Sequence, residues 1–291
     1  MKDNQQCIKI IEPKGKWFDL KLREIWSYRD LVLLFVKRDF ISKYKQTILG
    51  PLWAVIQPLL TTIVFTIIFG NLAKLTTADT LNTGNTVIPS FLFYMSSTIV
   101  WTFFSTTVQS TSNTFIGNMA IMGKVYYPRM VTPISVALSN LIPLFIQFVM
   151  MIVIMIVSIL NGSAVIYATP YLILVPLCIV QIILLSTGIG IIISSLTTKY
   201  RDLAMLVGFG LQLWQYASPI AYGVTLIPDN RLWLYMINPV SPIITSIRYG
   251  LFGTGYFKLD LYLMSWLITL IAFLMGLILF NRIEKTFMDT V

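Results

Sequence analysis

Residues 38–55 read RDFISKYKQTILGPLWAV, and this stretch joins a strongly basic segment to a long apolar one. The cations in and beside its first half are Lys37, Arg38, Lys43 and Lys45. The charges end at Gly50-Pro51, where an apolar run begins. Because an α-helix of about 20 apolar residues crosses a ~30 Å hydrocarbon core, the run predicts a membrane span. Glycine can end the basic segment and proline suits the first turn of the next helix.

The composition extends this reading to the whole chain of 291 residues, of which 56% are hydrophobic and 11% charged. About a quarter of the residues in a typical soluble protein are charged, so this class is excluded. We therefore expect an all-α polytopic membrane protein. Residues 1–26 are polar and contain no apolar segment of the kind a signal peptide needs, which predicts a cytoplasmic tail.

Uncharged apolar length predicts six spans, at about 51–70, 88–111, 131–159, 171–196, 203–221 and 261–280. The region 222–258 is also apolar, but it contains Asn238-Pro239, Pro242 and Arg248. Prolines and a charge are costly in lipid, so we interpret it as an external pair of short re-entrant helices. With this assignment 17 of the 21 Lys and Arg lie on one side, which predicts that both termini are cytoplasmic.

The six predicted spans contain no Asp, Glu, Lys, Arg or His, and the chain has no histidine at all. Proton-coupled transporters and membrane-embedded enzymes need such groups, so neither class is favoured. Residues 117–125, GNMAIMGKV, resemble a phosphate-binding loop, but five residues separate the glycines and Val125 replaces the Mg²⁺-binding hydroxyl. We therefore expect no catalytic residue, cofactor or metal in this chain, and ATP hydrolysis in a separate subunit.

Residues 26–60 closely resemble the opening of permease subunits of type-two ABC exporters for polysaccharides such as O-antigen, capsule or teichoic acid. The matching pieces are Tyr28-Arg29-Asp30, Arg38-Asp39, Lys43-Tyr44-Lys45, Leu49-Gly50-Pro51-Leu52-Trp53 and Gln57-Pro58. Asn238-Pro239, the downstream Arg248 and the six-span layout extend the resemblance over most of the chain.

The resemblance implies a homodimer in the bacterial cytoplasmic membrane that binds two ABC nucleotide-binding subunits, which hold ATP and Mg²⁺. It implies a channel at the dimer interface for a polyprenyl-diphosphate-linked glycan, and no role in nucleic-acid binding. It also divides the chain into an interface helix at 27–45 and a permease domain at 46–291 with a coupling loop at 113–129. The residues expected to contact the ATPase are Arg29, Asp30, Lys37, Gly117, Gly123, Lys124 and Arg129.

The basic residues before the first span have two interpretations. They can be a plain topological anchor, or Arg38, Lys43 and Lys45 can contact a diphosphate or lipid headgroup, since each cation near an anionic leaflet contributes ~1 kcal/mol. Arg248 can likewise meet a diphosphate, pair with Asp229 or interact with the C-terminal end of a helix. The sequence leaves these alternatives open.

Phe91, Tyr94, Thr98, Trp101 and Ser105 lie 3, 4, 3 and 4 residues apart, and so share one face of the second span. Aromatic planes and hydroxyls suit a sugar conduit, so we predict that this stripe lines the channel, with Gln212 and Gln215 on the fifth span. Helix packing is the alternative. The family's external gate is expected at Tyr222, Trp233, Asn238, Pro239 and Tyr249.

Two other functions remain open. A type-two ABC permease for a small hydrophobic drug shares the span count and the missing ATPase, but predicts a less basic joint and no aromatic-hydroxyl stripe. A non-transporting membrane scaffold would bind partners without ATP-dependent movement of a substrate.

Overall fold

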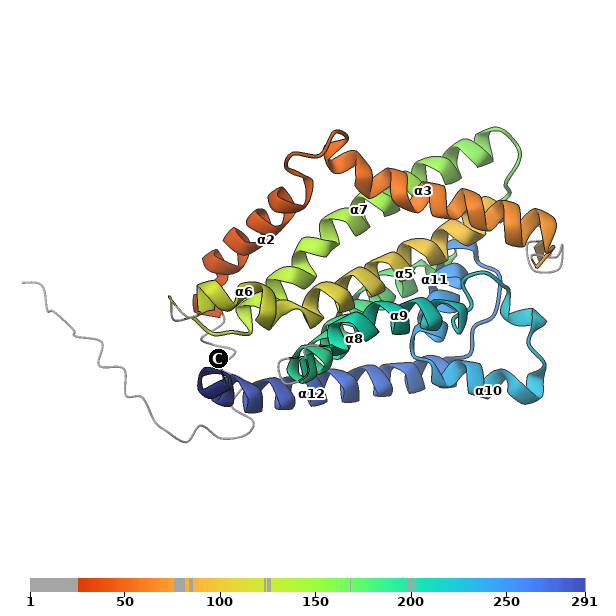
Figure 1. Cartoon of the computed structure of the whole chain (residues 1–291). Helices are drawn as coiled ribbons and strands as arrows, with labels where there is room; N and C mark the ends of the chain where they lie inside the picture. Colours follow the sequence, from red (N-terminus) through yellow and green to blue (C-terminus); the bar gives the residue numbers. More distant parts are fainter. Residues whose placement is uncertain are drawn as a thin grey trace, which may run out of the picture.

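The computed structural model describes residues 26–75, 82–83, 86–122, 124, 127–167, 169–197, 200 and 202–290. The described chain is almost entirely helical (Figure 1). Its elements are α2 (Arg29–Tyr44), η1 (Gly50–Leu52), α3 (Trp53–Phe65), η2 (Thr66–Leu72), β1 (Asn82–Thr83), β2 (Thr86–Val87), α5 (Ser90–Ser112), α6 (Thr114–Met122), α7 (Val131–Leu160), η3 (Pro170–Ile173), α8 (Leu174–Thr197), α9 (Leu203–Tyr216), η4 (Val224–Leu226), α10 (Asp229–Ile237), α11 (Val240–Phe252) and α12 (Leu259–Thr290).

Five of the predicted spans are confirmed as helices long and apolar enough to cross a membrane. Among the described residues these are Gly50–Leu72, Ser90–Ser112, Val131–Leu160, Pro170–Thr197 and Leu259–Arg282. The predicted fifth span is wrong in length, because α9 has 14 residues and ends at Tyr216. At 1.5 Å per residue it extends about 21 Å, against ~30 Å of hydrocarbon. Pro219 explains the early end, since a proline disfavours helical backbone in the residue before it.

The joint between α2 and α3 has the geometry that its sequence predicts. Gly50 has a φ of 53°, which glycine adopts without steric cost, and Pro51 lies in the first turn of η1. α3 follows directly and continues as a π-helix, η2, from Thr66 to Leu72. The predicted interface helix at 27–45 matches α2, which meets α3 at a sharp bend (Figure 1).

α5 is the central helix of the molecule, and it packs against α3, α7, α8, α9 and α11. α8 and α12 form the other close pair (Figure 1). A Cβ added to Gly276 would lie 2.7 Å from the Gly188 carbonyl oxygen, and one added to Gly188 would lie 2.7 Å from Phe273 Cα. Small residues let helix backbones approach in this way within membranes.

The two ends of the helical bundle differ. At one end α2, α6, α7, α8 and α12 share an aromatic-rich cluster, in which Phe115 stacks on Phe280 at 4.9 Å and Phe35 meets Tyr127 edge-on at 5.6 Å. The other end holds the β1–β2 hairpin with α10 and α11 (Figure 1). The region 222–258 does contain the expected pair of short helices, and α11 is almost wholly buried. The re-entry of the region 222–258 into a bilayer stays a prediction.

Candidate functional site

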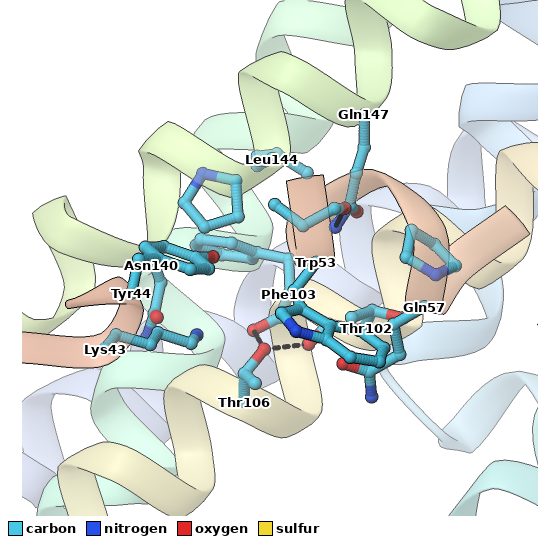
Figure 2. A pocket seen from close by; sticks show the side chains of 13 residues that line it. Lys43, Tyr44, Trp53, Gln57, Thr102, Phe103, Thr106, Asn140, Leu144 and Gln147 are labelled. Atoms are coloured by element: carbon cyan, nitrogen blue, oxygen red, sulfur yellow. Dashed lines mark hydrogen bonds between the residues drawn. The ribbon is translucent and has the colours of Figure 1, made fainter. Parts of the chain in front are cut away.

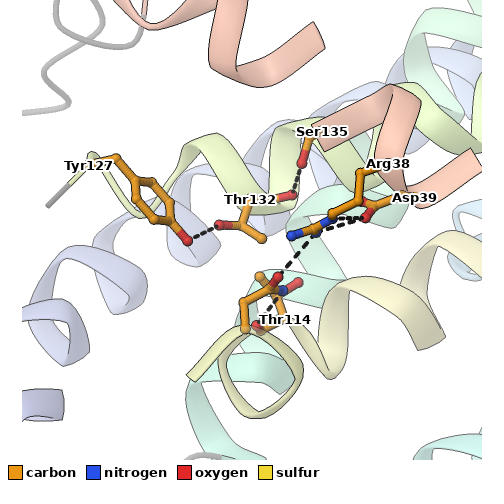
Figure 3. Close-up of polar contacts among 7 residues, drawn as sticks. Arg38, Asp39, Thr114, Tyr127, Thr132 and Ser135 are labelled. Carbon is orange, nitrogen blue, oxygen red and sulfur yellow. Dashed lines mark hydrogen bonds and ion pairs between the residues drawn. The ribbon is translucent and has the colours of Figure 1, made fainter. Parts of the chain in front are cut away.

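Arg38 connects α2 to α6 inside the predicted coupling region (Figure 3). Its Nε and Nη2 lie 2.8 and 2.7 Å from Asp39 Oδ1, and Nη2 also donates to Asn118 Oδ1 at 3.1 Å. Asn118 Nδ2 in turn donates to the Thr114 carbonyl at 3.0 Å, and the guanidinium lies 4.4 Å from the centroid of the Phe35 ring. Arg38 therefore holds two helices together in this structure, and its contact with a headgroup stays a prediction.

The other cations of the joint are more open to solvent. Lys37, Lys43 and Lys45 are exposed, and Arg29 forms an exposed ion pair with Asp30 at 3.9 Å. The Lys43 ammonium lies 5.9 Å from the Tyr44 ring centroid, and desolvation lowers the pKa of Lys43 below its usual value.

Three of the predicted coupling residues, Arg29, Asp30 and Lys37, lie on α2, and the other four lie on α6 or between α6 and α7. Gly117 and Lys124 are exposed and Arg129 is half-buried, whereas Gly123 lies outside the described residues. The predicted coupling loop 113–129 thus contains a helix, Thr114–Met122, that is tied to α2 through Asn118.

The Arg38 contacts give a testable prediction. Arg38→Lys keeps the charge but loses the planar fork that reaches Asp39 and Asn118 together. We expect Arg38→Lys to destabilise the purified protein almost as much as Arg38→Ala, by about 1–2 kcal/mol. Thermal unfolding in detergent measures this, with Lys37→Ala as the exposed control. A lysine variant as stable as wild type would show that charge alone matters at this position.

Arg248 lies 5% exposed in α11, where it binds the chain segment that follows α9. Its Nη1 donates to the Pro219 carbonyl at 2.9 Å, and its Nη2 donates to the Ile220 carbonyl at 3.1 Å and to Ser97 Oγ at 2.8 Å. The guanidinium carbon lies 3.7 Å from the centroid of the Phe93 ring. Arg248 therefore binds carbonyls just beyond a helix C-terminus in this structure, and its contact with a diphosphate stays a prediction.

Asn238 holds the same segment from the other end of α11. Its Oδ1 accepts from Trp214 Nε1 at 2.9 Å and from the Val240 backbone N–H at 3.1 Å. Its Nδ2 donates to Ser218 Oγ at 2.8 Å. Asn238 and Arg248, for which the sequence predicts separate roles, together fix the path of residues 217–220.

The remaining residues of the expected external gate occupy different environments. Trp233 is exposed, and Tyr222 is half-buried with its ring 6.2 Å from that of Tyr235. Tyr249 stacks on Phe257 at 5.3 Å. Pro239 is buried, and its carbonyl accepts a hydrogen bond from Ser265 at 2.7 Å. Nothing in these contacts assigns a gate, which stays a prediction.

The aromatic stripe on α5 is largely buried within the protomer. Tyr94, Thr98 and Trp101 are 0%, 1% and 5% exposed, while Phe91 and Ser105 are half-buried. Thr98 Oγ1 lies 2.9 Å from Thr62 Oγ1 on α3. Neighbouring helices cover the three central residues within the protomer, and the channel-lining role stays a prediction. On α9, Gln212 is exposed and Gln215 half-buried.

A cavity of about 160 Å³, lined by both polar and apolar side chains, opens beside this stripe, between the α2–α3 joint, α5 and α7 (Figure 2). Its lining includes Thr102 and Thr106, which follow the stripe residues Trp101 and Ser105 by one position. The face of α5 that lines the cavity is therefore displaced by one residue from the face that was predicted to line a channel. The other lining residues are Lys43, Tyr44, Trp53, Ala54, Gln57, Pro58, Phe103, Asn140, Pro143, Leu144 and Gln147.

This cavity was not predicted from the sequence. Its signal was the pair of amides, Asn140 and Gln147, seven residues apart on one face of α7, a largely apolar helix without charged residues. Amides inside an apolar helix are costly unless they are paired. Asn140 Nδ2 donates to Thr107 Oγ1 at 3.3 Å, and Gln147 Nε2 donates to the Ala54 carbonyl at 3.0 Å.

The fold and the cavity define a multi-pass helical membrane protein with an internal site whose described lining has polar and apolar side chains and one cation, Lys43. Among the described residues, no group of three or more His, Cys, Asp or Glu is placed to hold a metal. The chain matches the family described as the ABC-2 type transporter over residues 30–252, and it belongs to that family. It is therefore a transmembrane permease of the ABC-2 type.

Three relatives share this similarity over most of their length. Two are O-antigen export system permease proteins RfbA of Klebsiella pneumoniae, 28% and 27% identical over 264 and 261 residues. In both comparisons 89% of this chain and 94% of the relative are covered. A third, RfbA of Myxococcus xanthus, is 27% identical over 230 residues, which cover 78% of this chain and 82% of the relative.

Proposed function

We propose that this chain is the transmembrane subunit of an ATP-driven exporter that moves a lipid-linked polysaccharide across the bacterial cytoplasmic membrane. The observation that carries the proposal is the similarity to O-antigen export permeases over nearly the full length of both chains. The cavity supports it, because its lining combines hydroxyl, amide and aromatic side chains with a single cation, and a long glycan offers many hydroxyls and few charges.

The working assembly in this proposal is a homodimer with two ATPase subunits, which bind ATP and Mg²⁺. Both termini lie in the cytoplasm, and α9 with the segment after it forms the sixth crossing. The clustering of α2, α6 and the end of α12 at one end of the molecule supports this orientation (Figure 1). α6 is proposed to contact the ATPase, and the Arg38–Asn118 bond passes its movement to α2.

The diphosphate of the lipid carrier is proposed to meet Lys43 and Lys45 at the cytoplasmic edge. Both are exposed beside the start of the first span, and Lys43 also lines the cavity. On the opposite side, α10 and α11 are proposed to form the external gate, with Trp233 as its exposed aromatic residue.

Deletion of the chain from its host tests the proposal. We expect lipid-linked glycan to accumulate on the cytoplasmic face of the membrane, and a plasmid-borne copy to restore the glycan at the cell surface. The measurement is the sugar content of the extracted lipid fraction and of intact cells. Normal surface glycan in the deletion strain, together with sensitivity to a small hydrophobic drug, would contradict it.

A further inference from the structure

Gln147, which lines the cavity between α3, α5 and α7, carries a buried acceptor that lacks a partner among the described residues. Gln147 is 3% exposed, and its Nε2 donates to the Ala54 carbonyl at 3.0 Å. This bond fixes the orientation of the amide, because only the nitrogen can donate to a carbonyl. The Gln147 Oε1 then accepts no hydrogen bond from any residue in the described part of the chain. A buried acceptor without a donor costs about 1–3 kcal/mol, so a ligand that supplies a donor would be stabilised here.

The other polar walls of the cavity also favour a ligand rich in donors. Thr106 donates its hydroxyl to the Thr102 carbonyl, and Asn140 donates to Thr107. Side chains that use their hydrogens within the protein keep oxygen lone pairs available. Figure 2 shows the amide of Gln147 turned toward the other lining side chains. A phosphate or another anion would be repelled by these oxygens. Among the described lining residues, Lys43 alone carries a charge that could offset this repulsion.

The aromatic part of the cavity gives a second element of recognition. Trp53 and Tyr44 both line it, and Trp53 is 44% exposed. An indole ring offers a flat apolar face as well as an N–H donor. Such a face suits the C–H side of a sugar ring, while the oxygens on the opposite walls suit its hydroxyls.

The size and position of the cavity agree with a single ring. Its volume of about 160 Å³ is roughly ten times what one water molecule needs, so one bound water would leave it largely unfilled. Gln57 lies seven residues after Gly50, about 10 Å along the first span. The cavity therefore lies just inside the membrane from the basic joint.

We propose that this cavity binds one sugar ring of the exported glycan. The Gln147 Oε1 accepts a sugar hydroxyl, the Trp53 ring packs against the sugar face, and Thr102 and Thr106 supply further acceptors. The site lies within a protomer, beside the shared channel of the proposed dimer. The inference rests on the proposed function and adds to it a first binding site for the sugars of the exported glycan.

Binding of lipid-free glycan tests the site. The probe is the glycan released by mild acid from the carrier that accumulates in the deletion strain, added without ATP to the purified permease–ATPase complex in nanodiscs. We expect Gln147→Leu to raise the Kd about tenfold, the effect of one lost hydrogen bond. Trp53→Leu, at an exposed position of the cavity wall, should raise it at least as much. Thr61→Val, which removes a hydroxyl from α3 outside the cavity, should leave it unchanged.

Three outcomes would overturn the inference. If the wild-type complex exports glycan and both variants bind the probe within twofold of it, the cavity inference alone fails. Displacement of the glycan by sn-glycerol 1-phosphate would identify a phospholipid headgroup site. If the wild-type complex neither exports nor binds glycan, the proposed function fails and the cavity inference fails with it.

Discussion

Replacing Arg248 with methionine is expected to destabilise the protein by about 3 kcal/mol, a large effect for a single substitution. Methionine fills much of the same volume but leaves the buried carbonyls of Pro219 and Ile220 without their donor. It also removes the contact with the Phe93 ring. We expect the unfolding midpoint in detergent to fall by roughly 5–10 °C.

The matched control for this change is Arg231→Met, because Arg231 is exposed on the neighbouring α10. It should shift the midpoint by no more than a degree or two. Arg248→Lys should lie between the methionine variant and wild type, since a point charge cannot reach all three acceptors of the guanidinium. Equal midpoints for Arg248→Met and Arg231→Met would show that the buried contacts contribute little.

Adding one methyl group at the α8–α12 contact should have a comparable effect. Gly276→Ala places a Cβ 2.7 Å from the Gly188 carbonyl oxygen, and Gly188→Ala places one 2.7 Å from Phe273 Cα. Both obstacles are backbone atoms, so the helices must separate instead of a side chain moving aside. We expect each variant to lose about 2–3 kcal/mol, and a leucine at either position to prevent folding.

Two comparisons make this prediction specific. Gly210→Ala on α9 meets nothing within 4 Å, so it should stabilise the protein by about 0.5–1 kcal/mol through helix propensity. The double variant of Gly188 and Gly276 should lose less than the sum of the two single losses, because the helices separate only once. Additive losses, or a destabilising Gly210→Ala, would contradict the account.

The spans and the joint could be predicted from sequence because they depend on local properties. Apolar length places five spans within a few residues of their observed bounds, and Gly50-Pro51 has the backbone conformation that its residues favour. The error in the fifth span is avoidable, since Pro219 lies inside the apolar run 203–221. Apolar length alone ignores that signal.

The site depends on contacts that no local pattern contains. Arg248 binds Ser97, which lies 151 residues earlier, so the choice among its three possible roles needs the fold. Periodicity identifies one face of α5, but α5 is covered on most sides. The packing of α3 and α7 decides which face of α5 remains uncovered. As a result Thr102 and Thr106 line the cavity, whereas Trp101 and Ser105 do not.

The buried arginine also has a consequence for the order in which the protein is made. The groups that bind it in this structure, Phe93, Ser97, Pro219 and Ile220, all precede Arg248 in the chain. Trp214 and Ser218, which bind Asn238, precede that residue as well. A ribosome therefore delivers the acceptors before it delivers the charge, and the cation leaves the insertion machinery with its binding site already synthesised.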